Sequence, residues 1–214
     1  MFRKILLKTK SIYRQSLFPY SPISLKKKVL FIHIPKAAGT AVRVALGEPE
    51  TGRLHLPWWV YHQASPQRFN NFYKFAFVRD PLDRVFSGYR YLKSGGNKMG
   101  DLEIAKYLEK YKSFNEFLEC EFLNGKMIYH PIFRPQSWYL CNWKGEIQVN
   151  FIGRFETMAD DFDIIADKIG LEDFKELTVI NKTLSKPEVF SIEAKEIIYN
   201  TYQDDYQIFD YSIQ

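Results

Sequence analysis

The sequence predicts an α/β fold, a three-layer sandwich in which helices cover both faces of a central, mainly parallel sheet. Strand-like and helix-like segments alternate along the chain, with no internal repeat and no low-complexity tract. Two runs, Val29 to Ile34 and Tyr73 to Val78, are apolar enough for strands that are buried on both faces. Each run leads directly into a helix start, which is the order of elements in a parallel βα unit.

The length of 214 residues predicts one domain with a sizeable core, preceded by a basic extension. We place the extension at residues 1–27 and the domain at residues 28–214. Residues 1–28 hold eight of the 30 Lys and Arg residues and none of the 25 Asp and Glu residues, so the rest of the chain carries a net charge of −3. A domain that binds duplex nucleic acid carries positive charge on the fold itself. The charge distribution therefore argues against a nucleic-acid partner.

The extension has apolar residues at helical spacing, with most of its basic side chains between them. One interpretation is an amphipathic helix at an anionic membrane surface, and the other is a first helix packed on the domain or a partly disordered tail. Lysines interrupt each short apolar run and no apolar stretch reaches about 18 residues, so we expect neither a secretory signal nor a membrane span. We expect a cytoplasmic protein. If the extension is an amphipathic helix, we also expect it to contact the inner face of the membrane.

The first strand passes into a loop that is typical of an anion site. Pro35 to Gly39 form the turn, and Thr40 to Leu46 can continue as a helix. Unpaired backbone N–H groups at the helix start, the helix dipole and the Lys36 ammonium would converge on an anion there. The three residues that follow Lys36 have little or no side chain to block its approach.

The position of the lysine separates this loop from the P-loop of nucleotide kinases, which reads G-x-x-x-x-G-K-[ST]. The chain contains no such string, and Met127 follows its one Gly-Lys pair, Gly125-Lys126. Lys36 comes early and Thr40 opens the helix, so the strand, loop and helix are P-loop-like but suit an anion that is held by amides and a lysine, without a metal. The alternative is an ordinary strand-to-helix turn with a surface lysine.

The second strand, Tyr73 to Val78, ends at a set of helix-start signals. Asp80 is expected to cap a helix in which Pro81 is the first residue and Asp83 lies in the first turn. This helix should run to about Lys93 and break at the Ser-Gly-Gly-Asn segment that follows.

Arg79 and Ser87 form a second anion-binding pattern at this point. Arg79 stands where the strand ends and Ser87 lies roughly two turns into the helix, so both can face the carboxyl edge of the sheet. Ligands of open α/β sheets bind at that edge, so Arg79, Ser87 and Lys36 could hold two anionic groups of one ligand. The alternative pairs Arg79 with a nearby carboxylate and leaves Ser87 on the helix surface.

The later elements follow from helix caps and one more strand-like run. In chain order they are a helix from Asp101 to Tyr111, a helix after Ser113, a strand from Ile147 to Ile152, a helix from Thr157 to Ile169 and a helix from about Ser191. Ser113 with Glu116, and Thr157 with Asp160, supply capping patterns for two of these helices, and Gly170 is a stop signal. Cys120 and Cys141 are too few and too far apart for a zinc framework, so we interpret both as structural thiols.

The two anion-binding segments together resemble those of the sulfotransferases that use 3′-phosphoadenosine 5′-phosphosulfate (PAPS), in particular the membrane-associated carbohydrate sulfotransferases and their short bacterial relatives. Residues 31–40, FIHIPKAAGT, resemble the 5′-phosphosulfate loop of that family, and residues 75–89, FAFVRDPLDRVFSGY, resemble its 3′-phosphate segment. Weaker likenesses are Pro135–Trp138, Phe151–Glu156, Asn181-Lys182 and Tyr206–Tyr211. The likeness runs from about residue 28 to the end of the chain.

The resemblance implies a PAPS-dependent transferase of the sulfotransferase and P-loop nucleoside-triphosphatase architecture, with adenosine 3′,5′-bisphosphate as product and no metal. The acceptor that it implies is a hydroxyl, expected to belong to a carbohydrate. The donor contacts that it implies are Lys36, Ala37, Ala38, Gly39, Thr40, Ala41, Arg79 and Ser87. Ala37 stands where the family often has threonine and Ala41 where serine is frequent, which removes two hydroxyl contacts and leaves the backbone donors.

Sulfuryl transfer needs a cation at the leaving oxygen and a base for the acceptor hydroxyl, by analogy with phosphoryl transfer. Lys36 is the natural cation. For the base we choose His62, because residues 61–66, YHQASP, resemble the histidine segment that precedes the 3′-phosphate strand of the family, and the ordinary pKa of histidine lies near working pH. The alternatives are that His62 only caps the helix after Pro66, and that His130 is the base.

A polar cluster of His130, Arg134 and Gln136 lies next to Trp138 in the sequence, and we place this cluster on the acceptor side. Glu156, which follows a strand, is expected to be structural. Two other functions stay open on these residues alone. An ATP-dependent kinase of related architecture would need Mg²⁺ and the missing Gly-Lys-[Ser/Thr], and a non-catalytic module would bind the nucleotide without turning over an acceptor.

Overall fold

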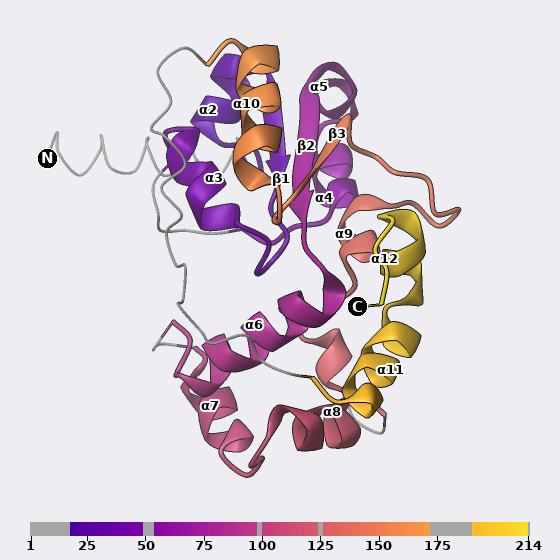
Figure 1. Ribbon diagram of the computed structural model, residues 1–214. Coiled ribbons are helices and arrows are strands. Elements are labelled where there is room, and N and C mark those ends of the chain that lie inside the picture. The colour runs from indigo at the N-terminus through magenta and orange to yellow at the C-terminus, as the bar shows by residue number, and fades with distance from the viewer. Residues whose placement is uncertain (1–17, 49–53, 98–99, 124–125, 172–189, 214) are drawn as a thin grey trace, which may run out of the picture.

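The computed structural model describes residues 18–48, 54–97, 100–123, 126–171 and 190–213 (Figure 1). Within these residues the strands form one parallel sheet in the order β1 (Val29–Ile32), β2 (Tyr73–Val78) and β3 (Phe151–Arg154). Phe31 pairs with Phe75, and Phe75 with Phe151, so the carboxyl ends of all three strands meet at one edge. The predicted parallel sheet is confirmed.

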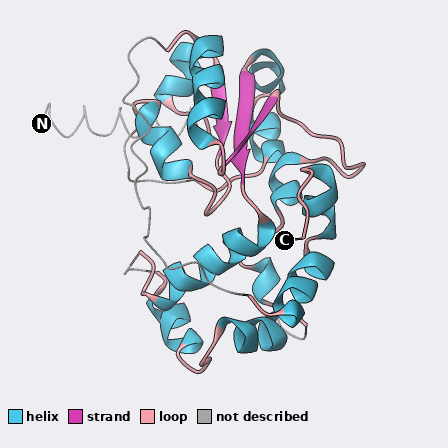
Figure 2. Cartoon of the chain, viewed as in Figure 1, coloured by secondary structure: helices cyan, strands magenta, loops and turns pink. Residues whose placement is uncertain are grey.

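Helices cover both faces of this sheet (Figure 2). On one face, Phe31, Phe75 and Phe77 pack against α3 (Gly39–Ala45) and α10 (Met158–Ile169). On the other face, Ile32 and Val78 pack against α4 (Trp58–Ala64) and α5 (Pro66–Asn71). Neighbouring strand residues point to opposite faces, so the uniformly apolar runs of the sequence supply both cores.

A separate helical layer lies beyond the carboxyl edge of the sheet (Figure 1). It contains α6 (Pro81–Lys93), α7 (Leu102–Leu108), α8 (Phe114–Phe122) and α11 (Ile192–Thr201), with α9 (Gln136–Leu140), α12 (Gln203–Ile208) and the 3₁₀ turn Met127–Tyr129 beside them. Its core is aromatic, built around Tyr89, Phe117, Phe133 and Tyr202. This aromatic core is a third hydrophobic core, which is distinct from the two that cover the sheet.

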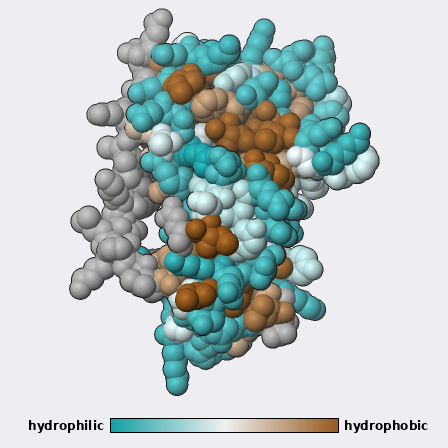
Figure 3. Space-filling view, turned by 45° about the vertical axis from the view of Figure 1, so that its right-hand side comes forward, coloured by the Kyte–Doolittle hydropathy of each residue, from teal (hydrophilic) through white to brown (hydrophobic). Residues whose placement is uncertain are grey.

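The described part of the predicted extension packs on the domain. Ser21 accepts a hydrogen bond from the Ser24 N–H and caps α2 (Pro22–Lys27), which contacts β1. Tyr20 is buried, and its hydroxyl donates to the Tyr61 carbonyl at 2.8 Å. The apolar and basic pattern of residues 1–17, like Asn181-Lys182, lies outside the described residues. No helix among the described residues is long and apolar enough to cross a bilayer, and the face in Figure 3 is mostly hydrophilic with separate hydrophobic patches.

Three predicted elements differ from the observed ones. The third strand begins at Phe151, because Gly145, at φ 79°, turns residues 141–147 back on themselves and Ile147 bridges to Cys141. Thr157 occupies the N-cap position of α10 as predicted, but its side chain accepts no capping hydrogen bond and instead donates its hydroxyl to the Asp161 carboxylate at 2.7 Å. The last helix is interrupted at Tyr202, whose buried hydroxyl bonds to the Phe133 carbonyl, and α12 follows as a separate helix.

The end of β3 is held by side chains from two directions. Asp161 accepts a hydrogen bond from the Arg154 N–H at 2.7 Å. The Arg154 guanidinium donates to the Phe209 carbonyl at 2.6 Å and stacks on the Tyr211 ring, with 4.6 Å to its centroid. The C-terminal segment is therefore bound to the outer strand of the sheet.

Candidate active site at the carboxyl edge of the sheet

The loop between β1 and α3 has an unusual backbone. Lys36 has φ 67° and Ala38 has φ 64°, so two residues other than glycine adopt the left-handed conformation within three positions. Such conformations cost about 1–3 kcal/mol each and cluster at ligand sites. Gly39 follows, and a Cβ added there would lie 1.7 Å from Nε2 of the His33 ring. His33 is buried and stacked on Phe31, so its ring fixes how closely the loop passes.

The start of α3 keeps its backbone donors. No side chain caps this end, and the first N–H groups of an α-helix have no partner within the helix. Ala37 is fully buried, whereas Lys36 and Thr40 are partly exposed on the loop. The N–H groups of residues 38–41 and the Lys36 ammonium therefore lie in the same short segment, whereas the Ala37 N–H donates to the Ile34 carbonyl at 3.4 Å.

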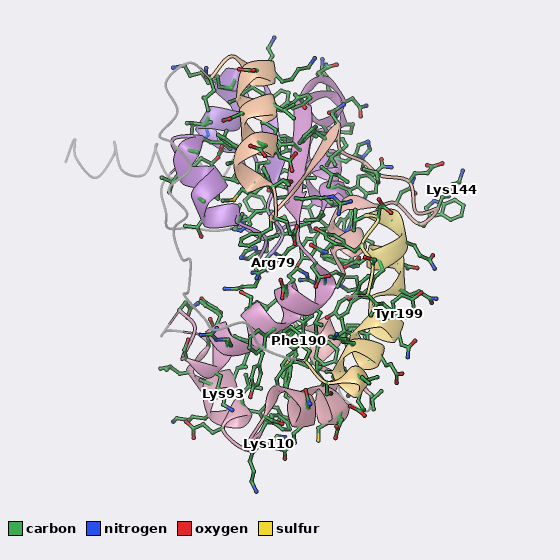
Figure 4. All side chains as sticks on the ribbon, in the orientation of Figure 1. Arg79, Lys93, Lys110, Lys144, Phe190 and Tyr199 are labelled. Carbon is green, nitrogen blue, oxygen red and sulfur yellow. The ribbon has the colours of Figure 1, made fainter. Side chains whose placement is uncertain are left out.

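Arg79 is a partly buried cation between the sheet and α6 (Figure 4). Its guanidinium stacks on Phe155, with 4.2 Å from Cζ to the ring centroid, and its side chain is 19% exposed. The nearest carboxylate oxygen, on Asp83, is 3.9 Å away, and that side chain is half-exposed. Among the described residues, no hydrogen-bond partner reaches the buried Arg79 Nε. Burial lowers the pKa of Arg79, and Asp83, Glu156 and Asp80 oppose that shift, so the group stays a cation with capacity for an anion.

The helix after Arg79 begins as predicted. Asp80 accepts a hydrogen bond from the Asp83 N–H at 2.9 Å, and Pro81 occupies the first helical position. The Asp80 N–H donates to Glu156 at 2.9 Å, and Glu156 also accepts from the Tyr211 hydroxyl at 3.0 Å. Glu156 thus joins the end of β3, the start of α6 and the C-terminal segment, which confirms its structural role.

The two anion-binding segments meet on α6. Ser87 and Tyr91 are one turn apart and lie on the same face of this helix. The Lys36 ammonium lies over the Tyr91 ring, with 4.3 Å to the centroid. The loop after β1 therefore touches α6 one turn beyond Ser87, which brings Lys36 and Ser87 to one region. Tyr91 was not predicted as a site residue, although its position four residues after Ser87 on a predicted helix could have indicated it.

His62 packs among aromatic side chains, whereas His55 contacts the loop that carries Lys36. His62, the predicted base, packs between Trp58 and Phe69, with centroid distances of 6.0 and 5.5 Å. His55 was not predicted, yet its Nδ1 lies 3.3 Å from the His33 carbonyl oxygen and its ring lies 4.3 Å from the His33 ring. His33 opens the loop that carries Lys36, so His55 contacts the loop directly.

The predicted acceptor cluster divides into a surface part and a buried part. Arg134 stacks on Trp138, with 4.3 Å to the ring centroid, and the edge of Trp138 meets the exposed Trp59. His130 Nδ1 accepts a hydrogen bond from the Ile132 N–H at 3.3 Å, and burial lowers the pKa of His130. Gln136 is fully buried, so its side chain does not line the surface and instead contacts Arg79.

Both cysteines are free thiols, Cys120 exposed and Cys141 half-buried. Within the described ranges, no group of three or more His, Cys, Asp and Glu side chains is arranged to hold a metal ion.

Comparisons with known proteins agree with this geometry. A model of the sulfotransferase family matches residues 57–212. The chain is 23% identical to carbohydrate sulfotransferase 10 of Xenopus laevis, over 88% of this chain and 66% of that protein. It is 27% identical to carbohydrate sulfotransferase 14 of Danio rerio, over 48% of this chain and 31% of that protein. The chain thus spans two thirds of these relatives or less, and no solved structure matches it. Because the family match covers most of the chain and includes Arg79, Ser87 and Gln136, the protein belongs to the sulfotransferase family.

Proposed function

We propose that this protein transfers a sulfuryl group from PAPS to a hydroxyl of a carbohydrate acceptor and releases adenosine 3′,5′-bisphosphate. The observation that carries the proposal is the partly buried Arg79 guanidinium at the carboxyl edge of the sheet, whose Nε is buried and unpaired among the described residues. A second cation, Lys36, lies in the loop that contacts the same helix. Two separated cations suit a ligand with two separated anionic groups. The names of both relatives support a carbohydrate acceptor.

The residues present fit such a donor. The unpaired Arg79 Nε offers a charge-assisted hydrogen bond to the 3′-phosphate, and Ser87 on α6 offers a hydroxyl. Lys36 and the backbone N–H groups of residues 38–41 suit the 5′ end, whereas the Ala37 N–H already donates to the Ile34 carbonyl at 3.4 Å. Gly39 leaves no Cβ between the loop and the His33 ring, so the loop can pack directly against that ring.

When bound, the donor would supply a sulfuryl group that is joined to a phosphate, and the phosphate is the leaving group. Lys36 would stabilise the negative charge that grows on the bridging oxygen as its bond to sulfur breaks. A histidine would take the proton from the acceptor hydroxyl as the new sulfur–oxygen bond forms. Trp138, Trp59 and Arg134 present an exposed aromatic and basic surface for the acceptor.

The base has two leading candidates. The resemblance favours His62, and the contact with the loop favours His55. Replacing the true base by alanine should leave the affinity for adenosine 3′,5′-bisphosphate unchanged and lower turnover by about 10²- to 10⁴-fold. The same measurement on His130→Ala tests the third candidate. Near-normal turnover in all three variants would contradict histidine as the base.

A thermal-shift comparison tests the nucleotide. Adenosine 3′,5′-bisphosphate at about 100 times its Kd should stabilise the protein by about 2.7 kcal/mol. For a chain of this size that corresponds to a rise in Tm of about 5–11 °C. Stabilisation by ATP and Mg²⁺ alone would favour the kinase. A positive shift with no transfer of labelled sulfate to any of a panel of glycans would favour the non-catalytic module.

A further inference from the structure

The side chain of Gln136 is bonded to the backbone of Arg79. The Arg79 N–H donates to Gln136 Oε1 at 2.9 Å, and Gln136 Nε2 donates to the Arg79 carbonyl at 2.8 Å. A backbone N–H can only donate and a backbone carbonyl can only accept, so these partners fix the orientation of the amide. Gln136 is fully buried, and both ends of its amide are used on one residue.

This pairing stands where the sheet stops. The β2–β3 ladder ends with the pair of Val78 and Arg154, so Arg79 follows the last paired residue of its strand. A primary amide presents a donor and an acceptor side by side, as the backbone of a neighbouring strand does. The Val78 carbonyl accepts from the Phe155 N–H on the β3 side, so the backbone groups of the next residue, Arg79, face the β1 side, where β1 has already ended at Ile32. Gln136 therefore takes the place of a neighbouring strand on that side and holds the backbone from which the Arg79 guanidinium projects.

Gln136 is itself held by buried charges on two helices. Asp205 on α12 is fully buried and accepts from the N–H groups of Gln136 and Ser137, at 2.7 and 2.8 Å. Burial raises the pKa of Asp205, whereas Arg84 and these two N–H groups lower it.

Arg84 on α6 holds the residues just before Gln136. It is fully buried and donates to the carbonyls of Ile132 and Arg134, at 2.9 and 2.8 Å. Arg84 on α6 and Asp205 on α12 thus hold residues 132–137, the segment whose Gln136 side chain bonds to Arg79.

We infer that Gln136 is a positioning residue for the donor site, which sets the place of the Arg79 guanidinium, and that Asp205 holds Gln136 in that role. The inference rests on the proposed function, in which Arg79 binds the 3′-phosphate. A shift of the Arg79 backbone would move the guanidinium off the Phe155 ring, which lies 4.2 Å from it. The affinity for a 3′-phosphate, and not for the rest of the nucleotide, should then depend on Gln136.

The test compares two ligands, adenosine 3′,5′-bisphosphate and adenosine 5′-monophosphate, which lacks the 3′-phosphate. Gln136→Met keeps the size of the side chain and removes both hydrogen bonds. It should weaken the bisphosphate by about tenfold to a hundredfold, the range for unmade buried hydrogen bonds, and leave the monophosphate unchanged. In an Arg79→Ala background the same substitution should add no further loss. Asp205→Asn should show the same selective loss as Gln136→Met.

Tyr139→Phe is the matched control, because Tyr139 is fully buried on the same helix and its hydroxyl donates to the Pro131 carbonyl at 2.8 Å. It should leave both affinities unchanged. Gln136→Leu, which buries no charge and also removes both hydrogen bonds, provides a second variant.

Four results would overturn the inference: no change in bisphosphate affinity, an equal loss for both nucleotides, an undiminished loss in the Arg79→Ala background, or failure of both Gln136 variants to fold while Tyr139→Phe folds. If the unmodified protein does not bind the bisphosphate, or if Arg79→Ala does not weaken it, the proposed function fails instead.

Discussion

Replacing Gly39 by alanine tests whether the His33 ring determines the shape of the loop before α3. The new Cβ would lie 1.7 Å from Nε2 and 1.8 Å from Cδ2 of that ring, about half of an ordinary contact distance of 3.4 Å. The His33 ring cannot easily move aside, because His33 is 5% exposed, stacks on Phe31 and lies 4.3 Å from the His55 ring. The chain must therefore move the loop or unstack the ring.

The expected cost follows from this overlap. Overpacking a tightly filled site costs about 1–3 kcal/mol, and we expect the upper end because three ring atoms are involved. A loss of about 3 kcal/mol lowers the Tm of a chain of this size by about 6–12 °C. Thermal and urea unfolding measure this change. Gly100→Ala is the control, because its nearest neighbour would be 3.9 Å away, and it should be close to neutral.

A second substitution separates the clash from other effects of the alanine. His33→Ala removes the ring and should destabilise the protein alone, but Gly39→Ala should then add little. The double variant should be more stable than the sum of the single losses predicts, by about 1–3 kcal/mol. An unchanged Tm for Gly39→Ala, or strictly additive losses, would refute the reasoning.

Two further predictions concern stability. Ala38→Gly should raise the free energy of unfolding by about 0.5–1 kcal/mol, because glycine adopts φ 64° without strain; a lower value in urea unfolding would count against this. Burial lowers the pKa of His130 below its unfolded value, so the unfolded chain binds its proton first, and the free energy of unfolding should fall as the pH drops below about 6.5. Urea titrations of His130→Asn over the same pH range should show a smaller decline, and an identical decline would contradict the assignment.

The parts of the fold that the sequence predicts well are those with local signals. The start of α6 is an example, since Asp80, Pro81 and Asp83 lie within four positions and their bonds do not depend on the rest of the chain. Arg79 is placed by the same signals. The apolar runs of β1 and β2 can also be recognised in the sequence, because each strand is buried along nearly its whole length.

The parts that the sequence does not predict depend on distant partners. Gln136 reads as a polar residue near a tryptophan, and its role follows only from a contact with Arg79, 57 positions away. His55 lies near the loop because the fold brings it against His33, which follows β1. The residues next to His55 in the sequence do not indicate this contact. The left-handed backbone of Lys36 and Ala38 is likewise imposed by packing, since neither residue favours it.

The bonds at the end of β3 have a consequence for the outer rim of the small sheet. An unpaired edge strand can recruit a strand from another molecule and begin aggregation. Here β3 spans only four residues, Asp161 already occupies the Arg154 N–H, and the Arg154 side chain ties the C-terminal segment to the same end. An incoming strand would therefore find few free backbone groups on this side. The shortness of β3 and the hydrogen bond from the Arg154 N–H to Asp161 on α10 thus limit intermolecular strand pairing at this end of the strand.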